Sequence, residues 1–310
     1  MLFHAIIENL NVNDITGFFV LLFFCTAHMV IGIGVGWVLA WLLKAKSNMK
    51  KLIMTAVAFE DTTAIPLVVV PVLKHDSITS SIHDFGKHAE EYVLIFTVFI
   101  IVYKWTVAYA MMEKDPIEAS AIEMMDEPIN TEKEVEPGKG GMWWKIKKIM
   151  NPPTYAALVA IPLALIPGID KWVFHYVLKG NIYAAIAMLG GTAGPVIDVI
   201  LGSNLSHGYP KEADIPWRNI IGIIIAKQVV MPIIGLGIIG GFYNLGWCDV
   251  TMAVMCMVIY SGPTSQQVFM ICVDHKNQVD NASKMYFAMY LFTVIPMSIW
   301  IIIILFLFLG

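Results

Sequence analysis

Charged residues are scarce in this 310-residue chain: Asp, Glu, Lys and Arg together make up only 14% of it, while hydrophobic residues make up 58%. A soluble domain of this length could not bury that much apolar surface, and the mean hydropathy of +0.71 agrees. The net charge of −4 argues against nucleic acid as a partner. The composition therefore predicts an integral membrane protein whose solvent includes the lipid bilayer.

Several motifs are also missing. The few cysteines lie in or beside apolar runs, without the spacing of a zinc site or a disulfide framework, which indicates small buried hydrophobes. They are Cys25, Cys248, Cys256 and Cys272. The first 14 residues contain neither a basic region nor a cleavage site of small residues, so no removable signal peptide is expected. The apolar segments contain no Ser/His/Asp, HExxH or paired-metal pattern, so we expect no enzymatic activity, no cofactor and no resident metal.

What the sequence does contain is a series of apolar runs. A spanning helix needs about 20 mostly apolar residues. The candidate segments are 18–43, 52–73, 92–112, 153–168, 181–203, 217–242, 249–272 and 284–309. The fourth is short for a full crossing. We therefore predict an all-α polytopic membrane protein with about eight transmembrane helices.

The loops differ in charge. Lysine and arginine are concentrated in alternate loops, and with eight spans this asymmetry predicts that both termini are non-cytoplasmic. Residues 113–150 are rich in Glu, Pro and Gly and poor in aromatics, so we interpret them as a cytoplasmic acidic linker. The linker separates a three-helix half, 1–112, from a five-helix half, 151–310. The endoplasmic reticulum and the plasma membrane are both open as the compartment.

The second apolar segment carries two adjacent acids, Glu60 and Asp61. A carboxylate at a helix centre costs about 2.5 to 3.5 kcal/mol on insertion scales, so two of them indicate a function. Pro66 follows, and proline frees backbone carbonyls inside a helix. Thr62 and Thr63 add hydroxyls at the same place. This pattern predicts a site for a coupling proton or sodium ion, against the alternative of a kinked helix with structural carboxyls.

A second interruption falls in the seventh segment, where Ser261, Gly262 and Pro263 break an apolar helix. Polar side chains in lipid cost several kcal/mol each unless they face a cavity. Four such residues follow the break: Thr264, Ser265, Gln266 and Gln267. Broken helices at corresponding places in two halves of a membrane protein indicate a transporter's binding site. We therefore predict that the second and seventh segments cross at the middle of the membrane.

Other polar residues lie within apolar segments. Lys227 needs an anionic partner, and the sequence leaves Asp61, Asp198 and a solute open. Asp198 is a secondary site candidate, with structural and functional interpretations evenly matched. Lys104 can snorkel to the interface. A histidine such as His28 more often packs between helices than titrates.

Two tracts suggest an internal repeat. AHMVIGIGVGW, which begins at Ala27, and AKQVVMPIIGLG, which begins at Ala226, each start with Ala and a basic or titratable residue. Each continues to a glycine face that permits close helix packing, and each precedes a proline-broken segment. If the first three segments match the last three, each segment lies five segments before its counterpart, and this odd offset inverts one half relative to the other.

On these motifs the chain resembles the auxin efflux carrier superfamily, especially its PIN-LIKES branch. FEDTTAIPL is similar to that branch's FGNTGNLPL, NPPTYAALVAIPLALIPGI to its NPPTIAAL segment, and LGGTAGPVIDVILGSNL to its LG...PL..LVLGANL. SGPTSQQ resembles the second crossover. The resemblance implies a ten-helix inverted repeat with crossed broken helices, as in bile-acid symporters and sodium/proton antiporters. It also implies that the first two of those helices are missing here or supplied by a partner.

The resemblance implies a secondary active transporter of a small organic solute, in particular an organic anion, that works by alternating access around Pro66 and Pro263. Here Asp61 stands where the family has an amide, which favours proton or cation coupling and argues against carrying over auxin itself. The rival hypothesis is a non-transporting membrane scaffold subunit of a larger complex. A second copy of the chain and other membrane proteins remain open as partners.

Overall fold

The computed structural model describes residues 15–113, with gaps at 63, 75–78, 80–81 and 83, and residues 213–309, together with a few isolated positions between 185 and 203. The expected fourth segment, the expected fifth segment apart from those isolated positions, nearly all of the expected linker, Thr63 and Asp198 lie outside the described residues.

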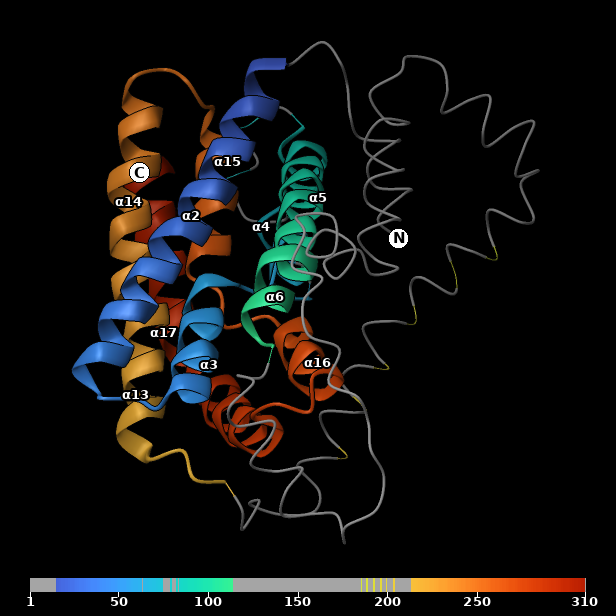
Figure 1. Cartoon of the computed structure of the whole chain (residues 1–310). Helices are drawn as coiled ribbons and strands as arrows, with labels where there is room; N and C mark the ends of the chain where they lie inside the picture. The colour runs from blue at the N-terminus through green and yellow to red at the C-terminus, as the bar shows by residue number, and fades with distance from the viewer. Residues whose placement is uncertain are drawn as a thin grey trace, which may run out of the picture.

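The first described part is a bundle of helices (Figure 1). A long apolar helix comes first, and the next segment is divided in two. The last is continuous but changes to π-helical geometry near its end. These elements are α2 (Ile15–Leu42), α3 (Ser47–Ala58), α4 (Ala64–Lys74), α5 (Phe85–Tyr103), η2 (Lys104–Ala108) and α6 (Tyr109–Met111).

The second described part also consists of one long helix, one divided helix and one further long helix, but here the π-helical stretch lies in the first of these instead of the last. Its elements are α13 (Trp217–Ile225), η4 (Ala226–Val230), α14 (Met231–Asn244), α15 (Val250–Tyr260), α16 (Gln266–Asp274) and α17 (Val279–Leu309). Six of the eight expected segments therefore correspond to described helices, and the two expected to be broken are the two that are divided.

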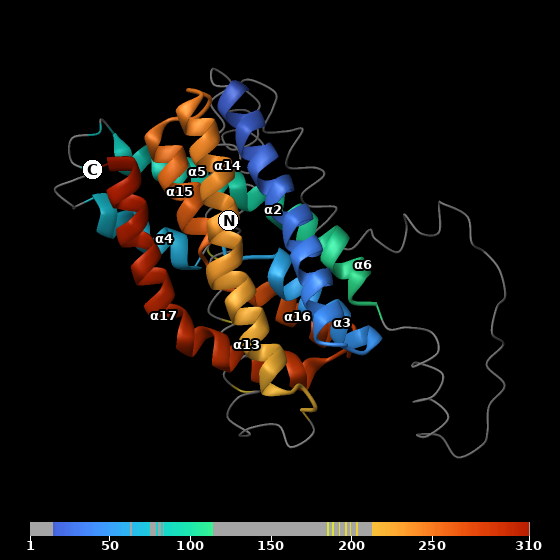
Figure 2. The ribbon, with the colours of Figure 1, turned by 90° about the vertical axis from the view of Figure 1, so that its left-hand side faces the viewer.

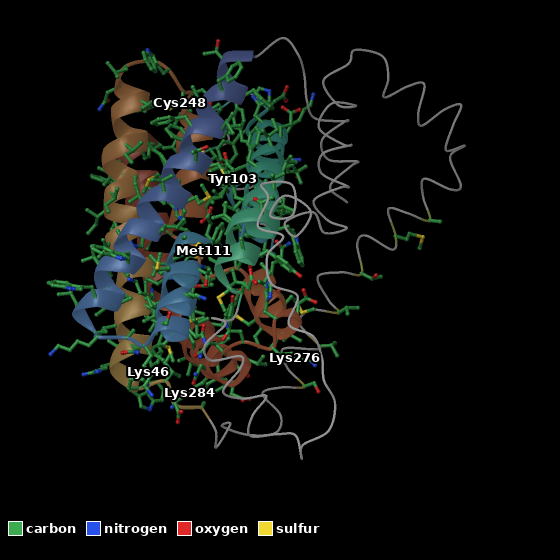
Figure 3. All side chains as sticks on the ribbon, in the orientation of Figure 1. Lys46, Tyr103, Met111, Cys248, Lys276 and Lys284 are labelled. Atoms are coloured by element: carbon green, nitrogen blue, oxygen red, sulfur yellow. The ribbon has the colours of Figure 1, made fainter. Side chains whose placement is uncertain are left out.

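Four of the described helices are long and apolar enough to cross a membrane: Thr16–Leu42, Phe85–Met111, Trp217–Asn244 and Val279–Leu309. The structure thus supports a helical integral membrane protein, while the count of eight spans stays a prediction. Lys46, Lys276 and Lys284 gather at the end of the bundle opposite Cys248 (Figure 3). These three lysines come from two of the lysine-rich alternate loops, which therefore lie at the same end of the bundle.

Glycine decides how closely α2 and α3 pack, and the two helices lie side by side in both views (Figures 1 and 2). A Cβ on Gly32 would lie 2.5 Å from the Ala58 Cα, and one on Gly36 would lie 2.7 Å from the Met54 Cα. Gly34, on another face, has open space around it. The close approach matters for the site because α3 leads directly into the acidic pair.

Candidate functional site

The two divided helices cross, and their extended interruptions pair with each other. Glu60 and Thr264 form an isolated antiparallel β-bridge. The Asp61 amide donates to the Pro263 carbonyl at 2.8 Å, and the Ser265 amide donates to the Phe59 carbonyl at 3.0 Å. Each break therefore satisfies backbone groups that the other leaves free, which lets extended backbone exist at the centre of an apolar bundle.

Local sequence explains where the helices stop. Pro263 cannot donate to the preceding turn and lies within the second break. A Cβ on Gly262 would lie 3.0 Å from the Ile259 carbonyl oxygen and 3.3 Å from that of Asp61, so a small residue suits the crossing. Pro66 is placed differently from the simple expectation, since it lies in the first turn of α4 and the break precedes it. Proline is tolerated there because the first amides of a helix have no intrahelical partner.

Side chains satisfy the carbonyls freed at the end of α3. The Thr264 hydroxyl donates to the Ala56 carbonyl at 2.6 Å. The Lys227 ammonium donates to the Val57 carbonyl at 3.0 Å. A cation at a helix C-terminus also interacts favourably with the helix dipole. Both groups come from the second half of the chain, so the broken end of α3 is completed by residues about 170 to 208 positions away.

Two tyrosines of helix α17 donate hydrogen bonds to the interruption between α15 and α16. The Tyr290 hydroxyl donates to the Thr264 carbonyl at 3.2 Å, and the Tyr286 hydroxyl donates to the Ser265 carbonyl. The two rings, one turn apart, are stacked with centroids 6.1 Å apart. On the first break, the Thr97 hydroxyl donates to the Thr62 carbonyl at 3.2 Å. The crossing is therefore held from several neighbouring helices.

We predict that Thr264→Val lowers the free energy of unfolding by about 1 to 3 kcal/mol, because the isosteric side chain leaves the buried Ala56 carbonyl without this donor. Unfolding in mixed detergent micelles, followed by circular dichroism, measures the change. Thr16→Val is the control, since that threonine is exposed at the start of α2. Equal stability of the two variants would contradict a role for the Thr264 hydroxyl in holding the crossing.

A fully buried cluster of charged groups lies at this crossing. The Glu60 Oε2 is 2.6 Å from the His28 Nε2 and 3.6 Å from the Lys227 Nζ, and all three side chains are 0% exposed. They come from α2, the first break and η4. The sequence proposed Asp61, Asp198 or a solute as the partner of Lys227, and Glu60 is the acid that the structure shows beside it.

A second lysine joins the same cluster. Lys104 is 2% exposed and Asp61 is 4% exposed, and Lys104 lies within electrostatic reach of both Glu60 and Asp61. The expectation that Lys104 snorkels to the interface is therefore wrong. Lys104 begins η2 and Lys227 lies in η4. π-Helical turns inside α-helices frequently occur at functional sites, and here each of two carries one buried lysine.

Most of the predicted site residues meet at the crossing. Those in or directly beside the two breaks are Glu60, Asp61, Thr62, Pro66, Pro263, Thr264 and Ser265. Lys227 joins them from η4, while Gln266 and Gln267 begin α16 and are partly buried. Sequence reasoning undervalued His28 and Lys104. The repeat offered a signal for the first, since it aligns His28 with Lys227, and these two residues meet with Nε2 and Nζ 3.3 Å apart.

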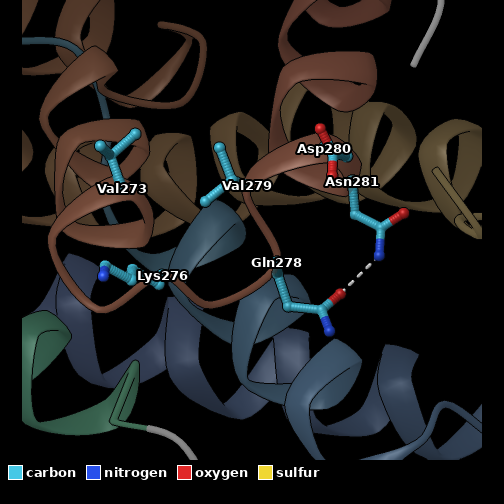
Figure 4. A pocket seen from close by; sticks show the side chains of 6 residues that line it. All are labelled: Val273, Lys276, Gln278, Val279, Asp280 and Asn281. Carbon is cyan, nitrogen blue, oxygen red and sulfur yellow. Dashed lines mark hydrogen bonds between the residues drawn. The ribbon is translucent and has the colours of Figure 1, made fainter. Parts of the chain in front are cut away.

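An open cavity of about 460 Å³ lies elsewhere, at the turn between α16 and α17 (Figure 4). Lys276 and Gln278 in this turn have positive φ angles of 48° and 60°. The Asn281 side-chain amide donates to the side-chain Oε1 of Gln278 at 2.7 Å and accepts from the Ile215 backbone amide at 2.8 Å. The turn belongs to the lysine-rich end of the bundle, so this cavity is distinct from the charged crossing.

Two broken helices that cross at buried charges inside an apolar bundle are typical of membrane transport proteins. Comparison with known families agrees, because a family model described as a membrane transport protein matches residues 1–301. The chain therefore belongs to this family of membrane transport proteins, and the resemblance to auxin efflux carriers is confirmed. It is an integral membrane protein of this family.

The chain is similar to several Arabidopsis thaliana proteins. Protein PIN-LIKES 3 is 25% identical over 241 residues, which cover 70% of this chain and 62% of that protein. Protein PIN-LIKES 1 is 26% identical over 242 residues, covering 70% and 50%. Protein PIN-LIKES 5 is 20% identical over 341 residues, covering 97% and 84%. The matches thus span between half and two thirds of the first two relatives, and no solved structure matches the chain.

Proposed function

We propose that this chain is a secondary active transporter that moves a small organic anion together with a proton, by alternating access around the crossing. The observation that carries the proposal is the meeting of the two breaks at the buried charge cluster. Backbone freed from helices can contact a solute and an ion without separate binding loops. The predicted eight spans and inverted repeat belong to this proposal.

Charge balance supports an anionic solute. With all four side chains ionised, Glu60 and Asp61 contribute two negative charges and Lys104 and Lys227 two positive ones, so the buried cluster is neutral when His28 is neutral. Uncompensated charge in a low-dielectric interior is costly. A solute that brings one negative charge is therefore accommodated best when the cluster gains one proton. Binding of the two is then mutually favourable, as coupled transport requires.

The basic groups also bear on the choice of coupling ion. Glu60 already lies between His28 and Lys227, so its carboxylate is committed to basic partners of this chain. Lys104 is within electrostatic reach of Asp61. These cations oppose the entry of sodium, whereas a proton can be stored on a side chain. Of the two coupling ions left open by the sequence, we therefore propose the proton.

Reconstitution of the full chain in liposomes tests the function. We expect labelled small carboxylic acids to accumulate when a pH gradient is imposed, above the level in protein-free liposomes that are loaded in the same way. In Asp61→Asn, one negative charge is removed and the cluster carries the extra positive charge permanently. Uptake by this variant should therefore lose its dependence on the gradient. Asp214→Asn is the control, because Asp214 is exposed and lies before α13.

The outcome that would overturn the proposal is equally concrete. If the wild-type chain moves none of these acids under either a pH or a sodium gradient, and gentle extraction retains partner proteins on it, the scaffold-subunit hypothesis is favoured. If Asp61→Asn keeps the gradient dependence of the wild type, the acid pair is not the coupling element.

A further inference from the structure

His28 has one ring nitrogen engaged and one without a partner. The ring is completely buried in α2, and its Nε2 lies 2.6 Å from the Glu60 Oε2. The Nε2 atom also lies 3.3 Å from the Lys227 Nζ, which donates to the Val57 carbonyl. Because the Glu60 carboxylate can only accept and lies nearer to Nε2, we assign the proton of the neutral ring to Nε2. In the neutral ring the other nitrogen, Nδ1, then presents a lone pair.

The Nδ1 atom has no hydrogen-bond partner among the residues that the structure describes. Buried polar atoms are nearly always partnered, and an unsatisfied one costs about 1 to 3 kcal/mol. A helix-packing histidine would use this atom to bind a neighbour. The unsatisfied lone pair instead marks the one position on the ring that can accept a proton without disrupting the contact with Glu60.

We propose that the Nδ1 atom of His28 is the position that accepts the coupling proton, which makes His28 the proton carrier of the cluster. This inference rests on the proposed function. The proton is added to the lone pair of Nδ1, the ring becomes an imidazolium, and no bond at Nε2 changes. The cluster thereby acquires the single positive charge that balances an anionic solute.

Neighbouring groups of both signs act on the protonation of His28. Glu60 favours the imidazolium, whereas burial and the ammonium groups of Lys104 and Lys227 oppose it. Among the residues that the structure describes, other titratable side chains near this cluster are Cys25 on α2 and Cys256 and Tyr260 on α15. The Tyr260 ring meets the imidazole edge-on, with centroids 4.2 Å apart. The arrival of one negative charge adds to the favourable side, so protonation is coupled to binding of the anion.

The protonation state of His28 can be measured without knowing the solute. The full chain is labelled with ¹⁵N-histidine in lipid nanodiscs, and the His28 signals are assigned from those that disappear in His28→Gln. We expect the Nε2–H form, with bare Nδ1, at alkaline pH, and protonation of both nitrogens on acidification. In Glu60→Gln the midpoint should move to lower pH by about one unit or more, because the favourable carboxylate is gone.

Two results would overturn the proposal. One is a proton on Nδ1 rather than Nε2 at alkaline pH. The other is a ring that stays neutral between about pH 4 and pH 8 while the fold is retained, a range that spans the ordinary titration of histidine. His88→Gln is the matched control, since His88 lies in α5 against Tyr92 and should leave the His28 signals unchanged.

Transport gives a separate readout. In liposomes, His28→Gln should reduce gradient-driven uptake at least tenfold, and the uptake that remains should not depend on pH. Asp61→Asn should instead retain uptake without the gradient. If the wild-type chain shows no transport while His28 titrates as described, the proposed function fails and the proton site stands. If the chain transports and His28→Gln keeps its pH dependence, the proton site fails alone.

Discussion

Glu60→Gln is expected to lower the free energy of unfolding by about 3 to 5 kcal/mol, because removing one member of a buried ion pair leaves the other charge uncompensated. The variant preserves the shape of the side chain but deprives His28 and Lys227 of the carboxylate that lies between them. The loss should appear as a lower midpoint of unfolding in mixed detergent micelles.

Two further variants show whether charge is responsible. Glu91→Gln removes an acid from a surface pair in which the Lys87 Nζ lies 4.0 Å away and the lysine side chain is 73% exposed, so its effect should be at most about 1 kcal/mol. Adding Lys227→Met to Glu60→Gln should restore much of the lost stability, because the unpaired ammonium is then gone. A double variant no more stable than Glu60→Gln would show that Lys227 is not the uncompensated group.

Gly32→Ala is expected to destabilise the chain by about 1 to 3 kcal/mol through overpacking and to abolish gradient-driven uptake. The added methyl group would lie 2.5 Å from the Ala58 Cα, which is backbone and cannot move aside as a side chain does. Helix α2 must therefore shift away from α3. Because His28 is one turn from Gly32 and Glu60 follows directly after α3, the 2.6 Å contact between them should lengthen.

Gly34→Ala is the matched control on the same helix. An added Cβ there meets nothing within 4 Å, and alanine has a better helix propensity than glycine, so stability should be unchanged or slightly increased. Both variants are measured by unfolding and by uptake into liposomes. Equal behaviour of the two would mean that the close approach of α2 to α3 does not position the charge cluster.

The breaks in the helices could be located from the sequence because their causes are local. Pro263 lacks an amide hydrogen, and polar residues beside it cannot face lipid without a partner. The two adjacent acids were recognisable for the same reason, since charge within an apolar run is costly. The exact role of Pro66 was not recognisable, because a proline that interrupts a helix and one that begins a helix differ only in the preceding backbone.

The partners at the site could not be predicted. Lys227 and Glu60 are separated by 167 positions, and nothing in the sequence indicates that Lys227 pairs with Glu60 and not with its neighbour Asp61. Periodicity places a residue on a helix face but does not state which helix lies opposite. For the same reason the sequence assigned the whole glycine face of α2 to packing, and only the position of α3 shows that Gly32 and Gly36 make the close approach while Gly34 has open space around it.

The sequence by itself determined that this is a membrane protein with two interrupted helices and buried acids, because hydropathy, proline chemistry and the cost of charge in lipid act within one segment. The tertiary structure alone decided that the interruptions pair as a β-bridge, that Lys104 and Lys227 both turn inward and that His28 meets Glu60. These contacts depend on the direction in which distant helices pack, and backbone groups freed in one half of the chain are satisfied only by the other half.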